Sequence, residues 1–218
     1  MTITEIKRKG KSELYYVYAD NQFFSLIEAE FIVKNKLKVG TEISKQNLEQ
    51  IKEQSDNLVC VSVALNYISK ALKSEHQLVQ YLKKHQFCDS AITMAVEKLK
   101  SYGYLNDEYL ADLIVKSAST QKGKNQIVAS LKNKGIKKEQ YQEYINNLEG
   151  QEGVCLSLAK KWLKGKELPL TTQNKAKLYR HLAGKGFEFE TIKSALNSIN
   201  EINGDEDDWN WFGGSAKN

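Results

Sequence analysis

The basic residues of this chain are the side chains through which it could act on a partner, and nearly all of them are lysine. Only two of the 32 basic residues are arginine. The net charge is 0 over residues 1–57 and +1 over 58–110, but it is +3 over 111–150 and +4 over 151–203. This asymmetry favours a polyanionic partner for the second half of the chain, with a solvated lysine-rich surface as the alternative. Because bidentate reading of guanine is mainly done by arginine, the lysines predict contact with phosphates and no reading of base sequence.

The residue patterns that carry catalysis are missing from the sequence. It contains no G-x-x-x-x-G-K-[ST] phosphate loop, no H-E-x-x-H motif and no G-x-S-x-G motif. The three cysteines and three histidines lack the close spacing of a zinc site. The one dense acidic cluster, 205–208, lies in a tail that offers no core to hold a metal site. We therefore expect no catalytic, cofactor-binding or metal-binding residues, and a protein that is not an enzyme.

The chain carries no signal for a membrane or for secretion. No apolar run approaches the roughly 20 residues that a bilayer requires. The first residues, MTITEIKRKG, lack the apolar stretch of a secretory signal. An odd number of widely spaced cysteines is typical of reduced thiols. These observations predict a cytoplasmic protein without membrane contact.

A repeat of about 50 residues organises the chain, as is typical of a helical array. From each of three starting points, Leu78, Ile127 and Leu178, steps of +4, +9, +14, +18 and +21 reach apolar or aromatic residues only. The starting points are 49 and 51 residues apart. The eighteen positions are Leu78, Leu82, Phe87, Ile92, Val96, Leu99, Ile127, Leu131, Ile136, Tyr141, Ile145, Leu148, Leu178, Leu182, Phe187, Ile192, Leu196 and Ile199.

The steps of the repeat translate into two helices joined by a polar turn. A step of four residues places two side chains on one helical face, and the last three positions mark a second helix. Gly135 and Gly186 stand in the turns, where a helix end favours a left-handed residue. An amphipathic stretch precedes each pair, so each unit has three helices, and the units must pack on one another to bury their apolar faces. The prediction is a mainly α fold of tandem three-helix repeats in an elongated array, with units at 58–106, 107–150 and 151–203.

Capping residues mark the expected helix starts. Serine, threonine, asparagine and aspartate are favoured there because their side chains accept hydrogen bonds from free backbone N–H groups. The candidate N-caps are Ser74, Asp89, Asn106 or Asp107, and Thr171 or Thr172.

The two ends of the chain differ from the repeats. Residues 1–57 alternate in polarity around turns at Lys9–Lys11 and Asp20–Asn21, which predicts a small antiparallel β element of two or three strands. A short helix is expected near Glu28–Lys36, and another should begin at Thr41 or Ser44. The acidic and aromatic tail, 204–218, lacks core periodicity and is expected to be disordered.

Several motifs in these units resemble those of the RecX family. The segment from Tyr102 to Asp107 followed by Ala111 is similar to its G-Y-L-D/N-D … A signature, and Lys122-Gly123 and Lys185-Gly186-Phe187 are similar to later motifs in the same order. The resemblance covers roughly 58–203, and the N-terminal extension resembles that of longer members from Gram-positive bacteria. An arginine-rich stretch of the family is replaced here by Lys70–Ser74, which removes its bidentate forks.

The resemblance implies a regulatory protein that binds RecA–single-stranded DNA filaments. Such proteins inhibit the recombinase, ATPase and coprotease activities of RecA, in DNA recombination, repair and the SOS response. They also bind DNA themselves, single-stranded first, with duplex as a further candidate, and we expect a monomer. The candidate DNA-binding and filament-binding residues are Lys122, Lys124, Lys132, Lys134, Lys160, Lys161, Lys164, Lys166, Lys177, Arg180 and Lys185.

Two other interpretations of the sequence stay open. A helix-turn-helix regulator would also be built from three-helix units, but its base reading fits poorly with so few arginines. Preferred binding to one duplex would favour it. A helical-repeat scaffold that binds only protein would leave the basic excess incidental, and failure to bind bare single-stranded DNA at low salt would favour that interpretation.

Overall fold

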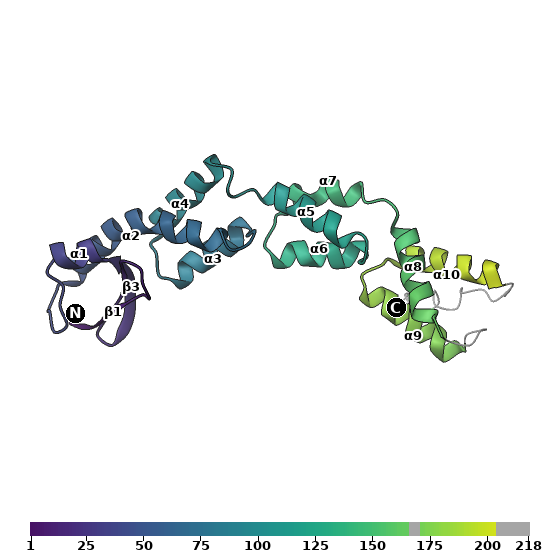
Figure 1. The fold of residues 1–218 in the computed structure, drawn as a ribbon, viewed down its shortest axis with the longest axis horizontal. Coiled ribbons are helices and arrows are strands. Elements are labelled where there is room, and N and C mark those ends of the chain that lie inside the picture. The colour runs from purple at the N-terminus through teal and green to yellow at the C-terminus, as the bar shows by residue number, and fades with distance from the viewer. Residues whose placement is uncertain (166–170, 204–218) are drawn as a thin grey trace, which may run out of the picture. The chain divides into compact units, whose positions relative to one another are not determined.

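The protein forms two compact units, Met1–Asp107 and Glu108–Asn218. The computed structural model describes residues 1–165 and 171–203, drawn in colour in Figure 1. Lys166 and the tail from residue 204, for which we predicted disorder, lie outside the described residues. The predicted fold class is confirmed, because the described residues form helices in sets of three and one small N-terminal sheet.

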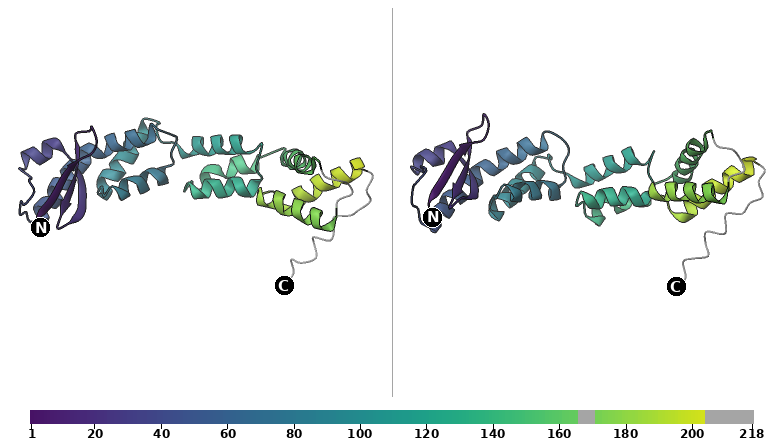
Figure 2. Two further views of the ribbon diagram at one scale, coloured as in Figure 1. Left: turned by 60° about the horizontal axis from the view of Figure 1, so that its bottom comes forward. Right: turned by 90° about the horizontal axis from the view of Figure 1, so that it is seen from below.

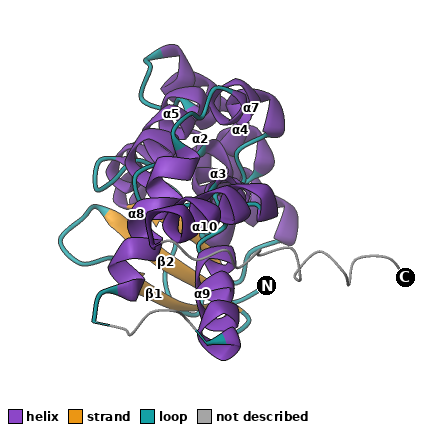
Figure 3. Cartoon of the chain, turned by 90° about the vertical axis from the view of Figure 1, so that its right-hand side faces the viewer, coloured by secondary structure: helices purple, strands orange, loops and turns teal. Residues whose placement is uncertain are grey.

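The N-terminal sheet has three antiparallel strands in the order β1-β2-β3, as the alternation predicted. The strands are β1 (Ile3–Arg8), β2 (Leu14–Ala19) and β3 (Gln22–Glu28), shown in orange in Figure 3. The turn between β2 and β3 consists of Asp20 and Asn21, with φ angles of +49° and +65°. Asparagine and aspartate tolerate this left-handed conformation, so a two-residue turn can join the strands.

Helix α1 (Ala29–Lys34) follows the sheet in the sequence, and the long helix α2 (Lys45–Ile68) continues from the sheet into the first repeat. Ser44 caps α2 as predicted, since its Oγ accepts a hydrogen bond from the backbone N of Asn47 at 3.2 Å. The two helices that we expected on either side of residue 57 are one helix of 24 residues. The reason is that no glycine or proline interrupts the sequence between Lys45 and Ile68.

Two apolar clusters of the first unit share helix α2. Its beginning, with Leu48 and Ile51, packs against the inner side of the sheet. Its second half, with Val59 and Val63, packs with Leu26 of β3 and with helices α3 (Glu75–Lys84) and α4 (Asp89–Ser101). The N-terminal sheet and the first three-helix repeat are therefore one folded unit.

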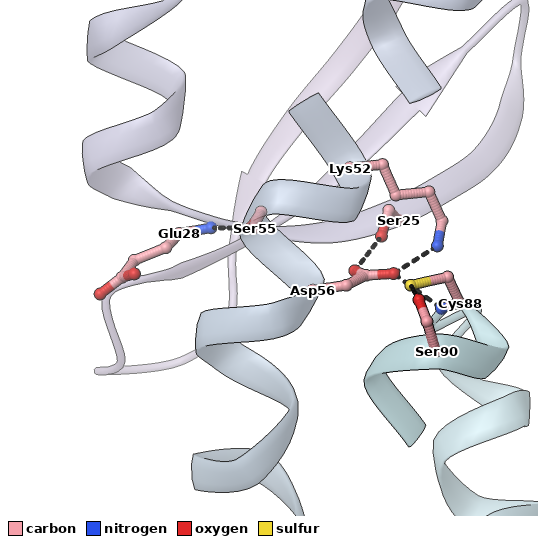
Figure 4. A network of polar contacts seen from close by, with 7 residues as sticks. All are labelled: Ser25, Glu28, Lys52, Ser55, Asp56, Cys88 and Ser90. Atoms are coloured by element: carbon pink, nitrogen blue, oxygen red, sulfur yellow. Dashed lines mark hydrogen bonds and ion pairs between the residues drawn. The ribbon is translucent and has the colours of Figure 1, made fainter. Parts of the chain in front are cut away.

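A buried carboxylate connects the sheet to the first repeat (Figure 4). Asp56 is fully buried, and its two oxygens accept hydrogen bonds from the Ser25 hydroxyl at 3.3 Å, the Cys88 backbone N at 2.7 Å and the Lys52 ammonium at 2.5 Å. We had expected Asp89 to cap α4. Instead α4 begins at Asp89, the N-cap Cys88 makes no side-chain cap bond, and Asp56 of another helix accepts the free N–H.

The second unit contains two further sets of three helices (Figure 2). Thr171 begins the ninth helix as predicted, its Oγ1 accepting from the backbone N of Asn174 at 3.3 Å. Each set encloses its own apolar cluster. The helices are α5 (Asp107–Ala118), α6 (Lys124–Asn133), α7 (Lys138–Asn146), α8 (Gln151–Leu163), α9 (Thr172–Gly184) and α10 (Phe189–Asn203).

Burial of the repeated positions confirms the repeat. Seventeen of the eighteen side chains are buried, and Leu148 is partly buried. Gly135 and Gly186 have φ angles of +72° and +87° in the turns, and Gln86 takes the same place in the first repeat with +63°. Ser74 caps α3, accepting from the backbone N of Gln77 at 3.1 Å. The periodicity of apolar residues was therefore sufficient to place the core.

Candidate nucleic-acid interface

The predicted site residues lie on the helices of the second unit and the turns between them. None of the ten described ones is buried, so each ammonium or guanidinium group can meet solvent. The eleventh, Lys166, lies outside the described residues. The ten residues are Lys122 and Lys124 at the start of α6, Lys132 and Lys134 at its end, Lys160, Lys161 and Lys164 at the end of α8, Lys177 and Arg180 on α9, and Lys185 after α9.

Two lysine-glycine steps of the second unit meet in space. The backbone N of Gly123 donates a hydrogen bond to the carbonyl of Lys185 at 2.8 Å, and the backbone N of Asn125 donates to the carbonyl of Gly186 at 3.0 Å. The beginning of α6 is thereby joined to the turn that follows α9. Lys122, which precedes Gly123, is brought close to Lys185 although 63 positions separate them in the sequence.

Glycine is required at this contact because the two backbones touch. A Cβ atom added to Gly123 would lie 2.2 Å from the backbone N of Phe187, and one added to Gly186 would lie 2.3 Å from the backbone N of Gln126. Real Cβ atoms essentially never come this close to backbone. The glycines of both motifs are thus explained by packing between repeats, and the lysines beside them are carried on a fixed backbone.

The start of α6 has no conventional cap. Its N-cap Gly123 has no side chain to accept a hydrogen bond, and the carbonyls of Lys185 and Gly186 accept from N–H groups of this helix end instead. Those backbone donors are therefore occupied. The charges next to this backbone contact are those of Lys122, Lys124 and Lys185, which are all partly exposed.

The charges at this point are not neutralised within the part of the chain that the structure describes. None of Lys122, Lys124 and Lys185 forms an ion pair there. The first turn of α6 contains no acidic residue, and the positive end of the helix dipole adds to the lysine charges. The three side chains together form what we call the lysine-glycine junction, an electropositive point on the second unit.

Four of the other predicted residues have local roles on their own helices. Lys132, Lys160 and Lys161 lie in the last turns of their helices, where a cation also stabilises the negative end of the helix dipole. Arg180 donates from Nε to the carbonyl of Ala176 at 3.2 Å. These positions have a local structural explanation, whereas Lys122 and Lys124 stand at the positive end of the α6 dipole, where a cation is not stabilised.

The described residues offer no cluster of metal ligands and no membrane-spanning helix. No group of three or more histidine, cysteine, aspartate or glutamate side chains there could hold a metal ion. Among the same residues, no helix is long and apolar enough to cross a membrane.

Comparison with known proteins places these repeats in a family. The family model described as the first three-helix domain of RecX matches residues 60–99, and the model of the third three-helix domain matches 154–196. The chain is 31% identical to the regulatory protein RecX of Clostridium beijerinckii, over 94% of this chain and 98% of that protein. The chain belongs to the RecX family. It is also 33% identical to the RecX protein of Clostridioides difficile, over 94% of this chain.

Solved RecX structures have the same fold. A crystal structure of a regulatory protein RecX aligns with a TM-score of 0.59 at 20% identity, covering 90% of this chain and 98% of that one. RecX from Lactobacillus salivarius aligns with a TM-score of 0.61 at 22% identity, covering 67% of this chain and 98% of that one. The resemblance that the sequence motifs indicated is confirmed by these comparisons.

The sequence of this RecX-family chain indicated the residues of the lysine-glycine junction, but it did not predict that they contact one another. Both Lys-Gly steps were recognised as motifs, each in its own repeat. One feature of the sequence could have predicted the contact. Gly123 stands at the start of a helix, where a residue with a capping side chain is favoured. A glycine without an evident turn at such a place indicates close approach of another backbone.

Proposed function

We propose that this RecX-family chain binds RecA–single-stranded DNA filaments and inhibits the recombinase, ATPase and coprotease activities of RecA. In this proposal, it also binds DNA without sequence preference. It acts by occupying the filament and not by catalysis. The three helix sets, at 58–106, 107–150 and 151–203, serve as its successive contact domains.

The observation that carries this proposal is the lysine-glycine junction of a chain whose relatives are named regulatory proteins. Unpaired lysines on a rigid backbone contact suit phosphates, and they supply no base-reading fork. Any change that the protein imposes on a filament is limited by its differential affinity for the active and inactive states. Contacts from several domains raise the effective concentration of each further contact, which supports inhibition by occupancy.

The test is the ATPase activity of purified RecA on single-stranded DNA, titrated with the intact protein. We expect ATP hydrolysis by RecA to fall and then to level off once the filament sites are occupied. Unchanged ATPase activity at saturating protein would refute the assignment.

A charge-matched pair of variants tests the junction. Lys122→Gln/Lys185→Gln removes two charges at the junction, and Lys137→Gln/Lys138→Gln removes two exposed charges at the start of α7 in the same unit. The first variant should need several times more protein for half-maximal inhibition than the second. Equal inhibition by the two variants would show that only the total charge of the unit matters.

A further inference from the structure

A cluster of aromatic rings and lysines lies in the first unit, outside the lysine-glycine junction. The rings of Tyr67 on α2 and Tyr81 on α3 are stacked, with centroids 3.9 Å apart and planes 9° from parallel. His85 meets the ring of Tyr81 edge-on at 4.6 Å. Tyr67, Tyr81 and His85 are each partly exposed, so this stack stands at the surface of the unit.

Two lysines lie over ring faces of this cluster. The Lys73 ammonium is 5.2 Å from the centroid of Tyr67, and the Lys9 ammonium is 5.8 Å from that of Tyr16 on β2. In both cases the group that lies over the ring face is the flexible side chain of a partly exposed lysine. Such a face is open to any flat group that displaces the lysine.

A groove of about 470 Å³ is lined in part by Lys9 and Tyr81 of this cluster. Its lining comes from the β1–β2 turn, including Lys9 and Lys11, and from α2 and α3, including Tyr81. Glu13 and Glu28 also line it, and Glu13 is paired with Arg8 at 2.5 Å. The groove thus combines cations, a ring and polar groups within one folded unit.

Positive charges lie close together in this cluster. Among the described residues, Lys9, Lys70 and Lys73 form no ion pair. Burial and then the charge of Lys70 lower the pKa of Lys9. Burial, followed by the charges of Lys9 and Lys84, lowers the pKa of His85. Cations that repel one another in this way attract an anion.

We propose that this tyrosine–lysine surface, made of Lys9, Tyr16, Tyr67, Lys70, Lys73 and Tyr81, binds single-stranded DNA. The lysines leave the ring faces to contact phosphates, and bases stack on the faces that they uncover. Stacked rings beside cations are the general device for holding single strands without reading their sequence. A duplex keeps its bases inside, and an acidic peptide has no need of ring faces. This inference rests on the DNA-binding part of the proposed function and needs no RecA.

The first experiment removes charge from this surface in the full chain. Lys9→Gln/Lys73→Gln is compared with Lys38→Gln/Lys98→Gln, which removes two exposed lysines of the same unit that touch neither the groove nor its rings. Binding to a fluorescent oligothymidine is measured by anisotropy over a range of salt. The log–log salt slope should become less steep by about 1.4 in the first variant, at about 0.7 for each phosphate contact, and stay nearly unchanged in the second. Equal slopes for the two variants would overturn the proposal.

The second experiment tests stacking with the wild-type chain. An oligothymidine and an abasic strand of the same length carry the same phosphates but differ in bases. The intact strand should bind at least about fivefold more tightly, since each stacked base contributes that much or more. Equal binding of the two strands would leave only phosphate contact and would overturn the proposal.

A ring variant assigns the base preference to these residues. Tyr67→Leu/Tyr81→Leu should lose the preference for the intact strand, and Tyr67→Phe/Tyr81→Phe should keep it because its rings remain. A folded leucine variant with the full preference would place stacking elsewhere and refute the assignment. If the leucine variant does not fold, the abasic comparison and the lysine pair still decide the question.

The outcome of these DNA-binding measurements is independent of the outcome of the RecA ATPase test. A protein that inhibits RecA but shows no base preference would overturn the inference and leave the proposed inhibition intact. A protein that binds single strands through Tyr67 and Tyr81 but leaves the RecA ATPase unchanged would keep the inference and refute the inhibition.

Discussion

Substitution of the glycines at the lysine-glycine junction should separate the second and third repeats. Gly186→Ala places a Cβ 2.3 Å from the backbone N of Gln126 and must also adopt a φ of +87°. Gly123→Ala places one 2.2 Å from the backbone N of Phe187, at an ordinary φ of −77°. The first change combines backbone strain with overlap, and the second tests the overlap alone.

The matched control is Gly150→Ala in the same unit. Gly150 has a φ of +73°, and nothing lies within 4 Å of an added Cβ. Its cost is therefore the left-handed conformation alone, about 1–2 kcal/mol. Gly123→Ala should cost about 2 kcal/mol, because two backbone hydrogen bonds of about 1 kcal/mol each are pulled apart. Gly186→Ala combines both effects and should cost about 3–4 kcal/mol.

The double variant Gly123→Ala/Gly186→Ala distinguishes one shared contact from two independent ones. Once one alanine has opened the contact, the second has little left to break. The free-energy cost should therefore stay near that of Gly186→Ala alone, well below the sum of the two single changes.

Thermal unfolding measures the loss of stability in these glycine variants, and amide hydrogen exchange shows whether the contact has opened. For a chain of this length, Gly123→Ala should lower the melting temperature by roughly 6 °C, at about 3 °C per kcal/mol. In Gly186→Ala, the amides of Gly123 and Asn125 should lose protection, because their acceptors are the carbonyls of 185 and 186. Retained protection of both amides would refute the explanation of these glycines.

The remaining predictions concern DNA affinity, the tail and the thiols. For the intact chain, binding to single-stranded DNA should have a log–log salt slope near −3.5 if about five phosphates are contacted, and a salt-independent affinity would contradict the phosphate mechanism. Removal of residues 204–218, which lack core periodicity in the sequence, should leave the melting temperature nearly unchanged; a large decrease would mean that their aromatic residues stabilise the body. At pH 8 a thiol reagent should modify partly exposed Cys88 quickly and the buried Cys60 and Cys155 slowly, and Cys88→Ser should abolish the fast phase. Burial raises the pKa of Cys60 to about 12 and that of Cys155 to about 11. Because the unfolded thiols titrate lower, these two groups should reduce stability as the pH rises above about 9, which urea unfolding at several pH values would detect.

Much of the helical fold could be predicted from the pattern of apolar residues alone. A helix must place apolar side chains on one face, so the repeated positions identified the cores of all three repeats before their packing was known. The continuity of α2 was missed because apolar patterning does not show where one core ends and the next begins along a single helix. Leu48 and Val59 belong to different clusters although both lie on that helix.

Contacts between elements were beyond the reach of local patterns. Asp56 accepts the N–H of Cys88 across 32 positions, and Asp89 was the better local candidate for that cap. The same limit applies to the lysine-glycine junction, where each motif is local and their meeting is not. The net charge of 0 over residues 1–57 gave no indication of the tyrosine–lysine surface, because a sum along the sequence does not show which cations lie together in space. What remains unpaired decides where an anion can bind.

The two proposed DNA contacts differ in physical character, and this difference fixes what the chain selects. The lysine-glycine junction offers charge without rings, so it holds phosphates of single strands and duplexes alike and weakens as salt rises. The tyrosine–lysine surface adds stacking, which a duplex cannot use and which releases no counterions. The preference for single strands should therefore come from the first unit. It should persist at salt concentrations that weaken DNA binding by the second unit. Both units belong to one chain, so DNA bound by one unit is present at a raised effective concentration near the other. The preference of the tyrosine–lysine surface for single strands therefore extends to the whole protein.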